Sequence, residues 1–190
     1  MKLLEPIVAW HHDISKIRRD IHAHPELAFE EFRTADVVAA KLEEWGIEID
    51  RGLGGTGVVG IIRGNLPGDR AVGLRADMDA LPMQEVNTFE HASTHAGKMH
   101  ACGHDGHTAM LLAAAQYLSQ HRDFAGTVYV IFQPAEEGGG GAKRMIDDGL
   151  FKRFPMEAVF GMHNWPGMKA GQFGLTAGPI MRPATSSPSS

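Results

Sequence analysis

Apolar positions along the chain predict helices that alternate with strands. Near the start, apolar side chains spaced by steps of three and four predict an amphipathic helix over residues 6–22. A second stripe predicts a helix over 35–45, with Thr34 as its N-cap and Gly46 just past its end. The first stripe consists of Ile7, Trp10, Ile14, Ile17 and Ile21.

Short runs rich in Val and Ile, separated by Gly, Pro and Asn, predict strands between further helices. The strands are expected at 47–51, 57–63, 71–76, 127–133 and 158–163, and the further helices at 107–121 and 141–151. The last two strands are apolar along their length, which is typical of strands covered on both faces. The pattern predicts an α/β domain with a central, mostly parallel or mixed sheet flanked by helices.

Composition excludes several classes of protein. The 190 residues carry a formal net charge of −5 and no basic block, so no nucleic-acid partner is expected. No apolar run approaches the roughly 18 residues of a membrane span. The first residues, MKLLEPIVAWHHD, do not resemble a secretory signal, so the expected location is the cytoplasm. The single cysteine, Cys102, cannot form a disulfide within the chain.

Reactive side chains follow the predicted strands at their carboxyl ends. Asp77 and Asp79 follow one strand, Glu136 and Glu137 follow another, and His163 closes the last. Ligands bind beyond the carboxyl ends of strands in open α/β sheets, so these side chains are expected to converge. The segment HACGHDGHT, residues 100–108, precedes a helix and can reach the same place.

The convergent set combines a thiol, imidazoles and carboxylates, which suits a divalent transition metal better than calcium or magnesium. Cys102 and His104 are one glycine apart, which favours a ligand pair. Each of the other residues also has an ordinary structural interpretation. His100 and His107 are interpreted as surface or helix-terminal histidines and Asp105 as a helix cap, while His163 could be a core histidine.

Five segments resemble, in their order and spacing, the hippurate hydrolase branch of the N-acyl-amino-acid amidohydrolases, relatives of the dinuclear aminoacylase and carboxypeptidase metallohydrolases. They are HPELAFEE, RADMDALPMQE, HACGHDGHT, FQPAEEGGGGA and GMHNWP, and the resemblance extends over about residues 10–181. It implies a zinc-exopeptidase-like fold, with residues 1–181 as the N-terminal part of the catalytic domain. Residues 182–190, RPATSSPSS, have no hydrophobic periodicity and are expected to be a disordered tail outside the family pattern.

The resemblance also implies the roles of individual residues. By motif, Cys102, His104, Glu137 and His163 are expected metal ligands, and Glu136 is the expected general base. Two divalent ions are implied, manganese or zinc, with cobalt and nickel as alternatives. Asp77 and Asp79 are expected to orient the ligands or to add negative charge near the metals.

The implied reaction is cleavage of the amide bond of small N-acyl amino acids such as hippurate by metal-activated water. Relatives continue into a lid domain that carries the dimer contact and supply one more metal-binding histidine, and neither is expected within these 190 residues. An inactive metal-binding fragment is therefore an alternative. A cysteine hydrolase, with Cys102 as nucleophile and His104 or His107 as base, is a further alternative.

Overall fold

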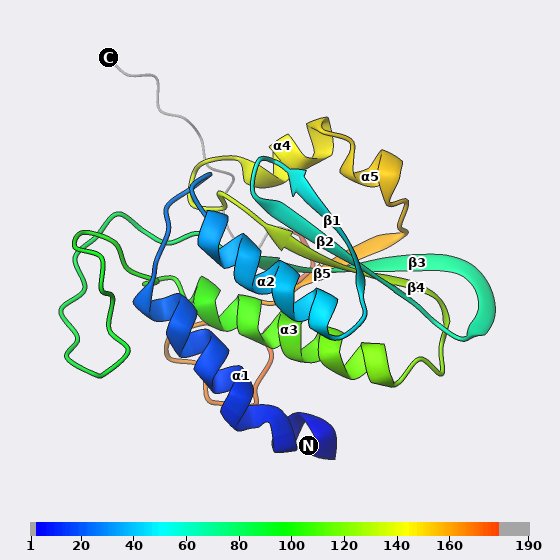
Figure 1. Cartoon of the computed structure of the whole chain (residues 1–190), viewed down its shortest axis with the longest axis horizontal. Helices are drawn as coiled ribbons and strands as arrows, with labels where there is room; N and C mark the ends of the chain where they lie inside the picture. Colours follow the sequence, from blue (N-terminus) through cyan, green and yellow to red (C-terminus); the bar gives the residue numbers. More distant parts are fainter. Residues whose placement is uncertain (1–2, 179–190) are drawn as a thin grey trace.

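The computed structural model describes residues 3–178, which form a five-stranded sheet with helices on both faces (Figure 1). Strands β3, β4 and β5 run parallel to one another, whereas the β1–β2 and β2–β4 pairs are antiparallel. The sheet is therefore mixed, as the sequence predicts. In spatial order its strands are β1 (Glu48–Leu53), β2 (Gly57–Arg63), β4 (Ala125–Gln133), β3 (Leu66–Asp77) and β5 (Ala158–Gly161).

Within the described residues, three long helices lie on one side of the sheet and two short helices on the other (Figure 1). Helices α2 and α3 pack directly on the strands, and α1 packs against α3. The predicted helix at 6–22 is confirmed by α1, and the helix predicted at 107–121 begins three residues earlier, at His104. The three long helices are α1 (Glu5–Ala23), α2 (Phe32–Glu44) and α3 (His104–Gln120), and the short ones are α4 (Gly141–Asp147) and α5 (Leu150–Arg153).

Strand β4 lies between two hydrophobic clusters. Val130 and Phe132, both fully buried, face the cluster that α2 and α3 complete, while Ile131 faces the cluster built around Met145 and Leu150. Successive side chains of a strand point to opposite faces, so an apolar run is what a doubly covered strand requires. The prediction of a strand covered on both faces is confirmed for residues 127–133.

The predicted N-cap of the second helix is wrong. Helix α2 begins at Phe32, so Thr34 lies in its first turn rather than before it. The carboxylate of Glu26 accepts hydrogen bonds from the backbone N–H groups of Arg33 and Thr34, at 2.9 and 2.8 Å. A carboxylate from the preceding loop therefore satisfies free N–H groups at the start of the helix, a role that the sequence assigned to the Thr34 hydroxyl.

Two predictions near the end of the described region are also wrong. The single helix expected at 141–151 is interrupted at Gly149, whose φ of +96° is left-handed, and this glycine separates α4 from α5. Strand β5 ends at Gly161, and all four of its residues are exposed rather than covered on both faces, as its position at the edge of the sheet explains. His163 thus follows the strand by two residues instead of closing it.

The tail predicted at 182–190 lies outside the residues that the structure describes. Within residues 3–178, none of the helices has the length and apolar character that crossing a membrane requires.

Candidate metal centre

The parallel strands bring their carboxyl ends to one edge of the sheet, where α3 also begins (Figure 1). Strand β3 ends at Asp77 and is followed by Asp79, β4 is followed by Glu136 and Glu137, and β5 is followed by His163. This is the place at which an open α/β sheet holds its ligands.

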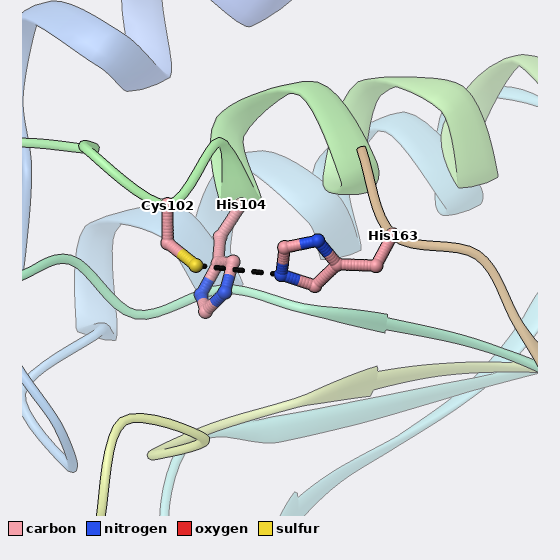
Figure 2. Close-up of side chains that lie close together, drawn as sticks. All are labelled: Cys102, His104 and His163. Atoms are coloured by element: carbon pink, nitrogen blue, oxygen red, sulfur yellow. Dashed lines mark hydrogen bonds between the residues drawn. The ribbon is translucent and has the colours of Figure 1, made fainter. Parts of the chain in front are cut away.

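The thiol and two imidazoles meet there. The Cys102 sulfur lies 3.3 Å from Nε2 of His163, although 61 positions separate the two residues in the sequence. Figure 2 shows Cys102 in the loop before α3, His104 at the start of that helix, and His163 reaching in from the segment after β5. One donor atom from each of the three residues lies within 4.8 Å of the others, which is close enough for a single ion to join them.

Carboxylates surround the same imidazole. Nε2 of His104 is 3.8 Å from oxygens of both Glu136 and Glu137, and 3.7 Å from Oδ2 of Asp77. His104 therefore belongs to three groups of donor atoms, the second with Glu136 and Glu137 and the third with Asp77 and His107. The structure brings together all five residues that the motifs assign to the metals and the base.

Two buried atoms at the centre of this cluster could bind a metal and have no hydrogen-bond partner among the described residues. They are Nε2 of His104 and Oε1 of Glu137. Buried polar atoms are normally paired, because an unpaired one costs about 1–3 kcal/mol. Nδ1 of His104 is 2.8 Å from the backbone oxygen of Asp79, to which it donates, so in the neutral ring Nε2 carries the free lone pair. A free imidazole lone pair beside an unpaired carboxylate oxygen fits a divalent cation.

The negative charge of the cluster changes the acidity of its members. Burial, together with the nearby carboxylates of Glu137 and Glu136, raises the pKa of the Cys102 thiol to about 12. Burial alone would lower the pKa of His104, but its hydrogen bond to Asp79 and the charge of Asp77 outweigh burial and raise it. The site thus favours added positive charge, whether as protons or as a metal ion.

Asp77 and Asp79 are almost fully buried and contact the ligand candidates or their neighbours. Burial opposes ionisation of Asp77, but its hydrogen bond from His107 and the charge of Arg75 prevail and lower its pKa well below the usual range. Oδ2 of Asp79 accepts a hydrogen bond from the backbone N–H of Glu137 at 2.9 Å. Both carboxylates therefore hold chain segments that carry candidate ligands.

The interpretation of His107 as a surface residue is wrong, although it does lie in the first turn of α3. Its side chain is buried, with Nδ1 2.6 Å from Oδ1 of Asp77, and Nε2 accepts a hydrogen bond from the backbone N–H of Asn164 at 3.1 Å. His107 thereby links the end of β3 to the segment that carries His163. The spacing of three between His104 and His107, which places both on one face of a helix, was the available signal.

Sequence reasoning also missed Asn164, whose side chain packs against the loop before α3. A β-carbon at Gly103 would lie 2.5 Å from Oδ1 of Asn164, and the φ of Gly103 is +89°. Only glycine permits this close approach in that conformation. The glycine between Cys102 and His104 therefore lets the segment of His163 approach the pair.

His100 was likewise wrongly interpreted as a surface or helix-terminal histidine. It is buried, neither ring nitrogen has a hydrogen-bond partner within the described part of the chain, and burial lowers its pKa to about 4. His100 belongs to none of the donor groups found there.

The prediction of Asp105 as a helix cap is wrong: α3 has no side-chain capping hydrogen bond, and Asp105 instead ties the start of α3 to α1. Its Oδ2 is 3.0 Å from Nδ1 of His22 and 3.0 Å from Nε of Arg18. Burial opposes ionisation of Asp105, but the hydrogen bond to His22 and the neighbouring positive charges lower its pKa to about 2. The ion pair fixes the helix whose first residue is His104.

This pairing predicts a dependence of stability on pH. The pKa of Asp105 falls from 3.8 to about 2 on folding, so its contribution of about 2 kcal/mol is present above pH 4 and is lost as the pH falls toward 2. Urea unfolding of the wild type and Asp105→Asn should show a difference in unfolding free energy at pH 5 that shrinks by pH 3. The surface replacement Asp13→Asn should cost little at either pH. A constant difference for Asp105→Asn would contradict the prediction.

Comparison with known sequences gives one matching family and close relatives. The profile of peptidase family M20/M25/M40 matches residues 73–183. The hippurate hydrolase of Campylobacter jejuni is 50% identical over 182 residues, which are 95% of this chain and 47% of that protein. The N-acyl-L-amino acid amidohydrolase of Geobacillus stearothermophilus is 46% identical over 178 residues, 92% of this chain and 45% of its own length.

A solved structure supports the same relationship. The crystal structure of a dinuclear metal-binding peptidase of the M20 family from Bacillus subtilis superposes with a TM-score of 0.85 at 42% sequence identity. The match covers 90% of this chain and 48% of that one. The chain thus spans about half the length of the relatives it matches.

Proposed function

The chain belongs to peptidase family M20/M25/M40, and we propose on that premise that it takes part in the metal-dependent hydrolysis of N-acyl amino acids. One observation carries the proposal: the thiol of Cys102, the imidazoles of His104 and His163, and the carboxylates of Glu136 and Glu137 converge at one edge of the sheet. Residues 1–181 would form the part of the catalytic domain that supplies these groups.

Cys102, His104, Glu137 and His163 are the proposed ligands of two divalent ions. The unpaired Nε2 of His104 and Oε1 of Glu137 support this assignment, and the mixture of sulfur, nitrogen and oxygen donors favours zinc or manganese, with cobalt or nickel as alternatives. When bound, such ions lower the pKa of water toward about 7 and polarise an amide carbonyl. The Cys102 thiol would lose its proton on binding, because the thiolate is the metal ligand.

Glu136 is the proposed general base. Its carboxylate lies beside the ligand candidates and is about a third exposed, so a water molecule and a substrate can reach it. As base it would take a proton from the attacking water and then pass that proton to the departing amine. Asp77 and Asp79 would hold His107, His104 and the backbone of Glu137 in place.

The names of two relatives support the substrate class, since one is a hippurate hydrolase and the other an N-acyl-L-amino acid amidohydrolase. The proposed substrate is accordingly a small N-acyl amino acid, cleaved to a carboxylic acid and a free amino acid. A cysteine-nucleophile mechanism is less well supported, because burial and carboxylates raise the pKa of Cys102, the opposite of what an activated thiol needs.

A second candidate function, for the 190 residues taken alone, is metal binding without turnover, since they match less than half of the length of each of these relatives. A hybrid protein separates the two. In it, this chain replaces the matching 182-residue segment of the Campylobacter hippurate hydrolase, and glycine release from hippurate is followed with Zn²⁺ or Mn²⁺. We expect the hybrid to release glycine, and this release to stop when EDTA is added. We expect the 190 residues alone to bind metal and to show less turnover than the hybrid.

The unaltered Campylobacter enzyme is the control for assay conditions. If the hybrid folds and retains metal but hydrolyses neither hippurate nor other N-acyl amino acids, the hydrolase proposal is wrong and the binding function remains. Equal turnover per metal in the hybrid and in the 190 residues alone would instead exclude the second candidate. Activity that resists EDTA would revive the cysteine mechanism.

A further inference from the structure

Glu31, the last residue of HPELAFEE, has a buried carboxylate that the proposed reaction does not use. The residue is fully buried and occupies the N-cap position of α2, yet its side chain makes no capping hydrogen bond to that helix. Glu26 in the same loop supplies the cap. The Glu31 side chain instead joins two other segments of the chain.

Those segments are the turn after β4 and the residue just before β2. Oε1 of Glu31 accepts a hydrogen bond from the backbone N–H of Ala135 at 2.8 Å, across 104 positions of sequence, and Oε2 accepts one from the Thr56 hydroxyl at 2.6 Å. Burial raises the pKa of Glu31 more than these hydrogen bonds lower it. A buried carboxylate, which is costly for the fold, thus binds the backbone N–H of Ala135, the residue just before Glu136.

Ala135 adopts a conformation that needs such support. It is fully buried and has a φ of +50°, the left-handed region that a non-glycine residue occupies at a cost of about 1–2 kcal/mol. The glycines that follow close the turn tightly: a β-carbon at Gly141 would lie 1.8 Å from the backbone oxygen of Pro134. Among the described residues, Oε1 of Glu31 is the hydrogen-bond acceptor of the buried Ala135 N–H, so loss of the carboxylate would remove that hydrogen bond.

Glu136 is consequently held from both sides. The N–H of the preceding residue, Ala135, is bound by Glu31, and the N–H of the following residue, Glu137, is bound by Asp79. Two buried carboxylates therefore fix the backbone from which the proposed base and its neighbouring ligand extend.

We propose that Glu31 is a positioning residue, which sets the turn at Ala135 and thereby the directions of the Glu136 and Glu137 side chains. This inference rests on the proposed function for its catalytic meaning, but the positioning itself is a property of the metal-free chain. HPELAFEE thus acts at the metal centre without contributing an atom to it.

The test compares Glu31→Ala and Glu31→Gln with the matched control Glu26→Ala, which removes a carboxylate of the same loop that caps α2. In the metal-free chain, hydrogen exchange of the Ala135 N–H, followed by NMR, should accelerate at least about tenfold in Glu31→Ala. It should stay slow in Glu31→Gln, whose side-chain carbonyl still accepts, and in Glu26→Ala, which should instead expose the N–H groups of Arg33 and Thr34.

The second measurement is binding of Co²⁺, with its visible absorption spectrum as a signature of ligand geometry. Glu31→Ala should weaken Co²⁺ binding about 10- to 100-fold and alter the spectrum, as loss of a group that orients ligands does. Glu26→Ala should lower the unfolding free energy and leave both affinity and spectrum unchanged. If Glu31→Ala does not fold, Thr56→Val, which removes one of the two donors to Glu31, should show smaller changes in the same direction, and Thr56→Ser should show none.

Unchanged exchange of Ala135 in Glu31→Ala, or in Thr56→Val where that variant has to be used, would overturn the inference whatever the metal data show. So would an equal loss of Co²⁺ affinity in Glu31→Ala and Glu26→Ala. If the wild-type chain and the hybrid bind no Co²⁺, the proposed function fails instead, and the exchange rates still decide whether Glu31 sets the turn.

Discussion

Replacing Glu136 by glutamine is expected to lower glycine release from hippurate by the hybrid protein about 10²- to 10⁴-fold while its metal content stays the same. A glutamine side chain keeps the size and one carbonyl oxygen of glutamate but cannot take up a proton, and a positioned general base contributes about that factor. Because Glu31 and Asp79 hold the backbone on both sides of Glu136, the substitution should not move the turn. The measurements are the initial rate and the metal-to-protein ratio of the same sample.

Glu137→Gln provides the matched control one position along the chain. Oε1 of Glu137 is a buried atom without a hydrogen-bond partner in the described structure, as expected for a metal ligand, so this variant should lose metal together with activity. If Glu136→Gln lost metal and Glu137→Gln retained it, the roles of the two glutamates would have to be exchanged. Full activity in Glu136→Gln would exclude it as the base.

The parts of the fold that could be predicted are the helices and strands that hydrophobic periodicity and strand composition indicate. The doubly buried β4 and the amphipathic α1 are local patterns whose packing follows from their period. The errors occur at the ends of helices, where the local sequence does not show which group satisfies the backbone or which conformation the chain adopts. Glu26 rather than Thr34 satisfies the start of α2, and Gly149, which looked like an ordinary position in a helical stripe, adopts a left-handed conformation that ends α4.

The same distinction applies to the site. Asp77, Glu136 and Glu137 could be placed together because parallel strands share an edge, a rule that needs only the order of strands. The resemblance to a family added the ligand roles. His107 and His100 were misjudged because burial depends on contacts with segments far away in sequence, such as Asn164, which lies 57 positions after His107. Glu31 likewise contacts residues 25 and 104 positions away, which no local pattern in the sequence indicates.

Replacing His104 by alanine is expected to weaken Zn²⁺ binding by the hybrid about 10²- to 10³-fold. His104 is common to all three groups of donor atoms found among residues 3–178, so no group survives its loss intact. Four protein ligands that share the roughly 10–16 kcal/mol of a structural zinc site contribute about 2.5–4 kcal/mol each, which corresponds to that range of affinity. Competition with a chromogenic chelator measures the change directly.

His100→Leu is the matched control, because His100 is a buried histidine of the same HACGHDGHT segment that lies outside the donor groups. Its ring is uncharged at neutral pH, since its pKa is lowered to about 4 by burial, and neither nitrogen has a hydrogen-bond partner in the described part of the chain. An apolar side chain of similar size therefore removes no hydrogen bond, and Zn²⁺ affinity should stay within about twofold, an energy below ~0.5 kcal/mol. Equal losses in His104→Ala and His100→Leu would mean that the segment binds metal through its overall folding and not through Nε2 of His104. A loss confined to His104→Ala would identify that atom as the one on which the whole centre depends.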